Sequence, residues 1–252
     1  MKTILNSYFQ ISEMKRPFRK SLLVSLLLVS QELSQSAVSQ EPAKSSLETI
    51  SKQNTQKVEP SYRENLSSLV GYMKERGFEI DTLIADQRFK IDDSIVVRFT
   101  RSSERVSKNL DAYKKALGFD EKKKRIPEFI ERNISTLKKA EQTYGIPKEV
   151  ISAIFGIESN FGQGTGRHNP FNVYVSMYVK SYRQDFAKGQ LEELLIFCKK
   201  KGIDVLDLKS SYAGAMTYAQ FIPSSLNRWF VGRELYSIDD NIMSVANYLS
   251  HF

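Results

Sequence analysis

Residues 144–162 read YGIPKEVISAIFGIESNFG, and this stretch decides the fold class of the chain. Pro147 suits the first turn of a helix, because its missing N–H costs nothing there and its φ angle is already helical. An apolar face then follows at the i, i+3, i+4 and i+7 spacing of an α-helix: Ile151, Ile154, Phe155 and Glu158. The stretch therefore predicts a helix whose apolar face ends in a carboxylate, with glycines at 156 and 162 on either side of it.

Glu158 is a candidate general acid. Burial against apolar neighbours disfavours the charged form of a carboxyl group and raises its pKa, so a Glu on such a face can hold a proton near neutral pH. The ordinary alternative is a carboxylate at a helix end that points into water, because Glu is rarely buried without a partner. On its own, this helix favours the ordinary alternative.

Two further blocks change that balance. Residues 211–225 read SYAGAMTYAQFIPSS, and residues 244–249 read SVANYL. The small residues of the second block allow backbone segments to approach closely, while its serine, tyrosine and glutamine side chains offer groups that can bind a polyol.

The three blocks in this order resemble the B-type lytic murein transglycosylases, periplasmic enzymes of the lysozyme-like superfamily. The resemblance runs from about Tyr113 to Phe252 and implies a mainly α, lysozyme-like catalytic domain. Members of that family continue past the third block, through a segment that returns a Tyr-Asn pair to the active site. The chain is therefore expected to be C-terminally short relative to the family, with its activity reduced by the truncation.

The resemblance also implies the chemistry. Glycosidases generally use two carboxylates, but nothing in the spacing of Asp185, Glu192 and Glu193 separates them from exposed surface charges. The lytic transglycosylases work with a single Glu, here Glu158. It protonates the glycosidic oxygen at the β-1,4 bond between N-acetylmuramic acid and N-acetylglucosamine, and then acts as base. The 6-hydroxyl of the muramic sugar closes the ring to a 1,6-anhydro product, so no water and no second carboxylate are needed.

A substrate-binding set carries over from the same resemblance: Ser211, Gln220, Tyr113, Arg183, Tyr218 and Tyr248. Ser211 corresponds to a serine that faces the catalytic carboxyl, Gln220 and the tyrosines to groove residues, and Arg183 to one of two adjacent arginines. The ordinary alternatives stay open, with Ser211 as a turn or cap residue, Gln220 as a helix cap and the tyrosines as core residues with a wet hydroxyl.

No cofactor and no metal are expected. Some family members have a calcium loop before the third block, but residues 232–240 are too short and too poor in spaced carboxylates for that geometry. His168 and His251 are the only histidines and Cys198 is the only cysteine, so a His/Cys zinc cluster is not expected either. Cys198 shares a helical face with leucines and is expected in the core.

The N-terminus has the order of a secretion signal. Four basic residues at positions 15–20 precede the apolar run 22–29, and Ala37-Val38-Ser39 supplies small residues for cleavage. We therefore expect a signal peptide over residues 1–39, with translation starting at Met14, and a periplasmic protein. No cysteine follows the apolar run, which argues against a lipoprotein. Residues 40–60 are polar and predict a linker, followed by the transglycosylase domain over 61–252 with its catalytic core at about 128–252.

The formal net charge is +8, but lysines and arginines are dispersed. The run Lys122-Lys123-Lys124-Arg125 has no interleaved aromatics and is expected to be a solvated helix end, so nucleic acid is not an expected partner. The expected partner is the glycan strand of peptidoglycan, and cell-wall synthesis or remodelling proteins are further candidates for a monomer. The alternative function is a truncated, non-catalytic relative that binds peptidoglycan.

Coarse patterning predicts further helices. One apolar face comprises Leu66, Leu69, Val70 and Met73 and ends at Gly77; one helix before the 147–158 helix carries Ile130, Ile134, Leu137 and Tyr144; the last carries Ile238, Ile242, Val245 and Leu249. Residues 95–99, IVVRF, form the only β-like run.

Overall fold

A computed structural model describes residues 60–100 and 110–252, in which helices dominate and β-pairing is limited to isolated bridges. The expected signal peptide and all but the last residue of the expected linker lie outside the described residues. None of the described helices is long and apolar enough to cross a membrane.

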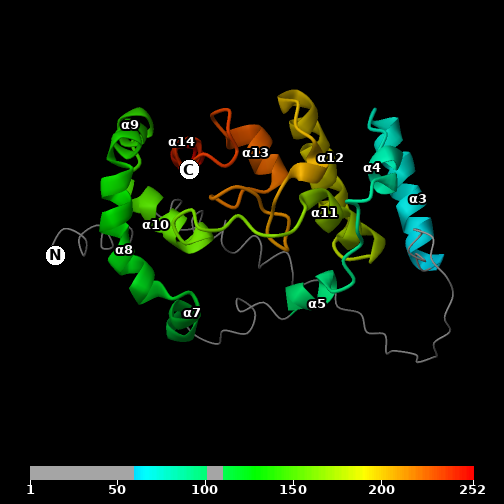
Figure 1. Ribbon diagram of the computed structural model, residues 1–252, viewed down its shortest axis with the longest axis horizontal. Coiled ribbons are helices and arrows are strands. Elements are labelled where there is room, and N and C mark those ends of the chain that lie inside the picture. The colour runs from blue at the N-terminus through cyan, green and yellow to red at the C-terminus, as the bar shows by residue number, and fades with distance from the viewer. Residues whose placement is uncertain (1–59, 101–109) are drawn as a thin grey trace. The chain divides into compact units, whose positions relative to one another are not determined.

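Figure 1 shows the helices in order along the chain. They are α3 (Pro60–Glu75), α4 (Asp81–Ala85), α5 (Ile95–Thr100), α7 (Leu110–Ala116), α8 (Phe119–Arg132), α9 (Ile134–Tyr144), α10 (Lys148–Ser159), α11 (Pro170–Val179), α12 (Gln184–Lys201), the 3-10 helix η1 (Val205–Asp207), α13 (Pro223–Trp229) and α14 (Ile238–Leu249).

Helix α11 is buried along almost its whole length. Asn169 caps its first turn by accepting a hydrogen bond from the Asn172 backbone N–H, and Pro170 follows at the first helical position. Its residues are apolar on nearly every side, as expected of a helix surrounded by protein. It packs on α12, α5 and η1, and Phe171 and Tyr174 are fully buried.

Helix α10 packs on α8, α9 and α14, and α14 packs on α9 (Figure 1). The aromatic rings of Phe155 and Phe129 join α10 to α8, with centroids 5.1 Å apart. The predicted last helix is confirmed as α14, in which Ile242, Val245 and Leu249 are buried. The predicted helix at 66–73 is confirmed as α3, which is followed by Gly77 in a left-handed conformation with φ +78°.

The β-like run at 95–99 is a helix, so that prediction was wrong. Helix α5 begins after Asp92, whose Oδ1 accepts hydrogen bonds from the backbone N–H and the hydroxyl of Ser94 at 2.9 and 2.6 Å. This contact is an Asx turn that directly precedes the helix. Ile95 and Phe99 lie one turn apart and are both buried, so tertiary packing overrides the β-propensity of the run.

The single helix predicted before α10 is divided into α8 and α9 at Asn133. Asn133 has φ −117° and ψ 22°, and its amide donates to the Phe129 carbonyl at 2.8 Å. The change of direction turns Ile134 outward, where it is 36% exposed, and puts Leu137 and Ala140 in the core. The predicted apolar face therefore failed at the break.

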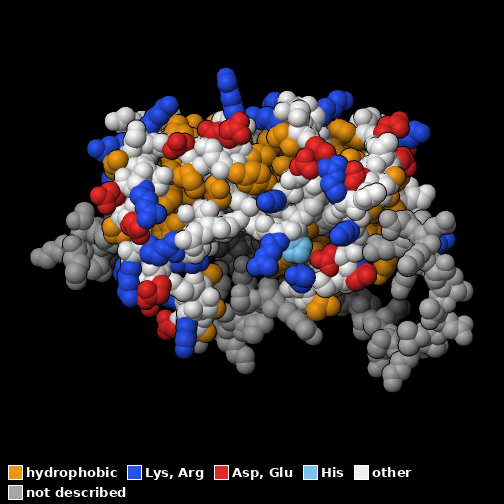
Figure 2. All heavy atoms as spheres, in the orientation of Figure 1, with side chains coloured by type: hydrophobic (Ala, Val, Ile, Leu, Met, Phe, Trp, Pro, Cys, Tyr) orange, Lys and Arg blue, Asp and Glu red, His pale blue; other side chains and the backbone are white. Residues whose placement is uncertain are grey.

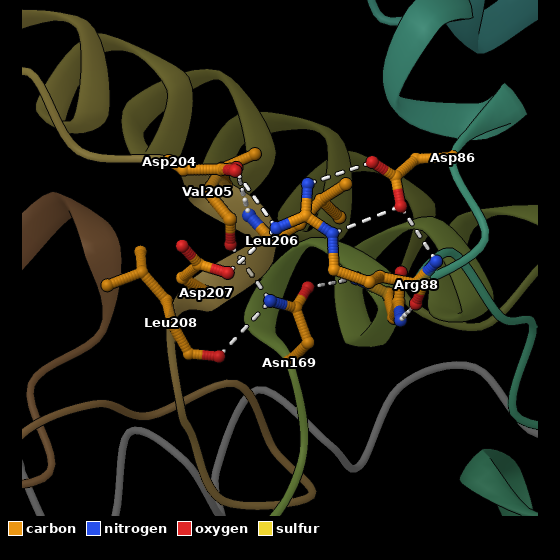
Figure 3. Close-up of polar contacts among 9 residues, drawn as sticks. Asp86, Arg88, Asn169, Asp204, Val205, Leu206, Asp207 and Leu208 are labelled. Atoms are coloured by element: carbon orange, nitrogen blue, oxygen red, sulfur yellow. Dashed lines mark hydrogen bonds and ion pairs between the residues drawn. The ribbon is translucent and has the colours of Figure 1, made fainter.

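Figure 3 shows how the N-terminal end of α11 is tied to η1. Asn169 donates to the carbonyl oxygens of Val205 and Leu208 at 2.8 and 3.1 Å. Beside it, the Arg88 guanidinium pairs with three carboxylates, at 2.8 Å for Asp86, 2.9 Å for Asp204 and 2.7 Å for Asp207. Exposed pairs of this kind contribute little each, but together these contacts fix the segment that leads to Ser210 and Ser211.

Candidate active site

Glu158 lies in the last turn of α10. The buried side of this helix is formed by Ile151, Ser152, Phe155, Gly156 and Ser159, whereas Glu158 is exposed. The expected burial of Glu158 was therefore wrong. Since successive residues are roughly 100° apart around a helix, the buried side is turned by about one residue from the expected face, towards the small residues Ser152 and Gly156.

The chain turns back on itself directly after Glu158. Asn160 and Phe161 both adopt positive φ, 51° and 62°, which is strained for residues with side chains. The turn packs the Phe161 ring against α10, because a Cβ on Gly156 would come within 2.9 Å of Phe161 Cζ. The Phe161 ring also lies 5.4 Å from that of Phe129. Gly156 therefore supports the corner that carries Glu158.

Two cations from α8 reach the same corner. The Lys122 ammonium donates to the Ile157 carbonyl at 3.3 Å, and Arg125 donates to Asn160 Oδ1 at 2.6 Å while its guanidinium lies 4.8 Å from the Phe161 ring centre. Burial lowers the pKa of Lys122, the negative charge of Glu158 raises it, and the positive charge of Arg125 lowers it. The ammonium and the carboxylate therefore interact electrostatically.

Lys122 and Arg125 were missed as site residues because the basic run 122–125 was interpreted as a solvated end. Lys123 and Lys124 are indeed exposed, but Lys122 and Arg125 are half-buried. Figure 2 shows basic and acidic side chains alternating over α7 and α8, with no basic stripe there. The signal available in the sequence was spacing, because positions i and i+3 share one face of a helix.

The second block lies against the segment that follows α10. His168 and Ser210 exchange backbone hydrogen bonds of 3.0 and 2.7 Å, and the bridges Ser210–Met216 and Met216–Phe221 continue this pairing through the block. The two backbone segments can approach this closely only with glycine at position 166, because a Cβ on Gly166 would lie 1.9 Å from the Ser210 carbonyl oxygen. The first and second blocks therefore share one backbone framework.

Tyr218 approaches the corner after α10 directly. A Cβ on Gly162 would lie 3.8 Å from Tyr218 Cδ1 and 2.4 Å from Ile238 Cδ1, and Gly162 itself has φ +81°. This places the second block, and the start of α14, against a residue only four positions after Glu158.

Ser211 and Gln220 both make local hydrogen bonds. Ser211 Oγ accepts from the Ala215 backbone N–H at 3.2 Å, across a turn in which Gly214 has φ +80°. Gln220 has φ 53°, and its amide donates to the Thr217 carbonyl at 3.0 Å. Ser211 thus has the turn role considered as its ordinary alternative, whereas Gln220, considered as a helix cap, lies in a turn; both side chains are half-buried.

Tyr248 contacts the second block, whereas Arg183 lies near Tyr174, which is bonded to that block. Arg183 lies over the Phe186 ring at 4.1 Å, and its charge reaches the buried Tyr174, whose hydroxyl donates to the Gly214 carbonyl at 3.0 Å. The ring of Tyr248 lies 5.9 Å from that of Phe221. Tyr113 lies in α7, a helix that packs on α8.

A separate cavity of about 420 Å³ is lined by residues of α3, α5 and the end of α11 together with Asp93: Tyr62, Asn65, Asp93, Val96, Val179, Lys180 and Ser181. Its polar groups already bond to one another. The Lys180 ammonium donates to the Tyr62 hydroxyl at 2.9 Å and to Asp93 at 2.6 Å, and the Asn65 amide donates to Val179 and Ser181. None of the expected site residues lines it.

Known proteins resemble this chain in sequence and in fold. The membrane-bound lytic murein transglycosylase B of Escherichia coli K12 is 35% identical over 119 residues, which are 44% of this chain and 33% of that protein. The structure of the E. coli lytic transglycosylase SLT35 in complex with calcium is 28% identical, with a TM-score of 0.63 over 76% of this chain and 62% of that one. The chain thus spans about a third of the curated relative and less than two thirds of SLT35.

SltB3 from Pseudomonas aeruginosa, solved in complex with NAG-NAM-pentapeptide, has a TM-score of 0.64 over 76% of this chain and 53% of that one. At 23% identity this likeness shows the fold alone.

The calcium of SLT35 prompts a test of residues 232–240. Asp240 Oδ2 accepts hydrogen bonds from the backbone N–H groups of Arg233 and Glu234, both at 2.8 Å. A Cβ on Gly232 would lie 2.3 Å from Asp240 Cγ, so the carboxylate is enclosed by its own loop. In the described part of the chain, no group of three or more His, Cys, Asp or Glu side chains could hold a metal ion. These residues do not fit a calcium ion.

The family assignment rests on most of the chain. Residues 30–252 match the family described as Transglycosylase SLT domain. The described residues have the helical fold of the SLT35-type structures, as the sequence predicted. The chain therefore belongs to the transglycosylase SLT domain family and has the lysozyme-like α-helical fold of the B-type lytic transglycosylases.

Proposed function

We propose that this chain is a peptidoglycan lytic transglycosylase with Glu158 as its single catalytic acid and base. One observation carries the proposal. The corner that follows Glu158 is joined through Gly162 and Gly166 to the second block, so a carboxyl group and a set of hydroxyl and amide groups stand on one framework. Family membership and the murein-cleaving activity in the names of relatives support it.

The proposed reaction consumes no water. Glu158 donates a proton to the glycosidic oxygen between N-acetylmuramic acid and N-acetylglucosamine as the bond from C1 to that oxygen breaks. The carboxylate left behind then removes the proton of the muramic 6-hydroxyl, and O6 bonds to C1 to form the 1,6-anhydro ring. General acid–base catalysis of this kind typically contributes about 10²- to 10⁴-fold.

The proposed glycan-binding residues are Ser211, Gln220, Tyr113, Arg183, Tyr218 and Tyr248. The local hydrogen bonds of Ser211 and Gln220 do not exhaust the capacity of a hydroxyl or an amide group. The tyrosines can offer ring faces to sugars and hydroxyl groups to their polar edges. For location, we propose the periplasm, because residues 15–39 have the order of a secretion signal.

A second function is favoured by the exposure of Glu158. Exposure does not favour the protonated form of a carboxyl group as burial does, and a protein with such a group could bind glycan strands without cleaving them. This would be the non-catalytic, peptidoglycan-binding relative.

The test is Glu158→Gln, which keeps the side-chain shape but cannot donate the proton. Purified sacculi would be digested with parent and variant, and anhydromuropeptides would be quantified by mass spectrometry. We expect release by the parent and at least about a hundredfold less by Glu158→Gln, with sacculus binding retained. Glu149→Gln is the matched control, because Glu149 lies on the same helix and pairs with Lys148 at the opposite end.

Release by Glu158→Gln near the parent rate would show that Glu158 is not the acid. If the parent binds sacculi and releases no anhydromuropeptides, the non-catalytic binding function holds instead.

A further inference from the structure

Lys122 is half-buried and donates to the backbone of α10, whereas Lys123 and Lys124 of the same basic run are exposed. We propose that Lys122 is a positioning residue for Glu158, which fixes the end of α10 and sets the charge state of the carboxyl group. This inference rests on the proposed function for its catalytic meaning, but the contact itself is testable without any substrate.

The geometry places the ammonium at the carboxyl end of α10. Lys122 projects from α8, which packs along α10, and donates to the Ile157 carbonyl at 3.3 Å. This carbonyl is one of the last four of the helix, which have no partner within the helix itself. A cation is also favourable at this end of the helix dipole. Lys122 thereby holds the backbone immediately before Glu158.

Charged side chains on the helices that pack on α10 have the following partners. Helix α8 supplies Lys122 and Arg125, and Arg125 is engaged with Asn160 and Phe161. Helix α9 supplies Glu141, which pairs with Lys148 at 3.6 Å at the other end of α10. From α14, Asp239 accepts a hydrogen bond from Thr136.

The electrostatic coupling works in both directions. The charge of Glu158 favours the protonated ammonium, so the ammonium equally favours the ionised carboxylate. Half-burial of Lys122 strengthens the interaction relative to one in water, since the effective dielectric constant is lower.

This has two opposing consequences for the proposed reaction. Stabilising the ionised form makes Glu158 a stronger acid when it donates its proton, but it also reduces the fraction that holds a proton at neutral pH. Removing the ammonium should therefore move the alkaline limb of the rate profile to higher pH and lower the maximal kcat. A purely structural role for Lys122 would not produce this pair of opposite changes.

The experiment compares Lys122→Met, Lys122→Arg and Lys123→Met. Lys122→Met keeps an apolar stem against α10, Lys122→Arg keeps the charge, and Lys123→Met removes the same charge from an exposed neighbour. The Glu158 carboxyl would be titrated by ¹³C NMR, with its signal assigned from Glu158→Gln. In parallel, kcat would be measured against pH on sacculi.

For Lys122→Met we expect the Glu158 titration midpoint to rise by about 0.5 to 1 pH unit, at the low end for an opposite charge because Glu158 is exposed. The alkaline limb of the kcat–pH profile should move to higher pH by the same amount, and the maximal kcat should fall about threefold to tenfold. Lys122→Arg should stay within about twofold of the parent, and Lys123→Met should change neither quantity.

A midpoint within about 0.2 pH units of the parent in folded Lys122→Met, or an equal shift in Lys123→Met, would overturn the proposal. If Lys122→Met does not fold, salt replaces the variant, because about 1 M salt should raise the midpoint in the parent by screening the pair. A midpoint that does not change with salt would overturn the proposal. A shifted midpoint in a parent that cleaves no glycan would reject the proposed function and leave the Lys122 contact standing.

Discussion

Gly166 allows the segment after α10 to pack against the backbone at the start of the second block. It has φ +96°, and a Cβ there would lie 1.9 Å from the Ser210 carbonyl oxygen, 2.2 Å from its carbonyl carbon and 2.5 Å from the Ser211 nitrogen. All three are backbone atoms, so no side-chain rotation can relieve the contact. Gly166→Ala must therefore separate the two segments.

The magnitude follows from what is lost. Positive φ costs an alanine about 1–2 kcal/mol. Separation also breaks the two hydrogen bonds between His168 and Ser210, each of which contributes about 1 kcal/mol. The sum is about 3–4 kcal/mol, a large fraction of the roughly 5–15 kcal/mol that stabilises a typical protein. For a domain of this size it corresponds to a fall in Tm of roughly 6 to 16 °C.

Gly164→Ala is the matched control, because a Cβ there meets nothing within 4 Å and its φ is not left-handed. The free energy of unfolding of both variants would be measured in urea, and the proposed glycan cleavage on sacculi. We expect Gly164→Ala to resemble the parent and Gly166→Ala to lose about a hundredfold in activity, since a displacement of about 1 Å is enough for such a loss. Free energies of unfolding within about 0.5 kcal/mol of each other in the two variants would contradict a steric role for Gly166.

Two further predictions concern titrating groups away from the site. Burial raises the pKa of the Cys198 thiol to about 12, so Ellman's reagent at neutral pH should react with it only after unfolding in urea; rapid labelling of folded protein would contradict its place in the core. The hydrogen bonds and charge of Arg88 lower the pKa of Asp86 from 3.8 to about 2. The stability that this lowered pKa contributes is present above the unfolded value and is lost as pH falls towards 2, so the stability gap between the parent and Arg88→Met should shrink over that interval in urea titrations, and a constant gap would exclude the linkage.

Helices with a clear apolar period were predictable, and those decided by tertiary contacts were not. The spacing of α14 is regular: Ile242, Val245 and Leu249 of its predicted face are buried, and Ile238 at its first turn is half-buried. The β-branched run at 95–99 has strand propensity, but an Asx turn at Asp92 precedes it and the core accepts Ile95 and Phe99 one helical turn apart. No proline or glycine marks the break between α8 and α9 at Asn133. The feature found there is a hydrogen bond from the Asn133 side chain to the Phe129 carbonyl, which the sequence pattern did not indicate.

The site was predictable where residue type alone determines backbone geometry. The glycines on either side of Glu158 are required by close contacts, at Gly156 with Phe161 and at Gly162 with Ile238. The cations were not predictable, because a basic run on a helix is usually solvated and only the packing of α8 selects Lys122 and Arg125 from it. Roles in binding stay predictions for the residues carried over by resemblance, Ser211 and Gln220 among them.

The exposure of Glu158 means that the raised pKa needed by a general acid must have another source than the apolar face of α10 in the proposed reaction. The apolar face of α10 was expected to supply a raised pKa, but that face turns away and the carboxyl group meets water. In the free protein, Lys122 adds a charge that favours the ionised form. The desolvation that favours a protonated acid would then have to come from the glycan, whose sugar rings exclude water as they cover the carboxyl group. Glu158 would then become a competent acid only with substrate bound. The strained turn at Asn160 and Phe161 keeps its carboxyl group at the surface, where a glycan strand can cover it.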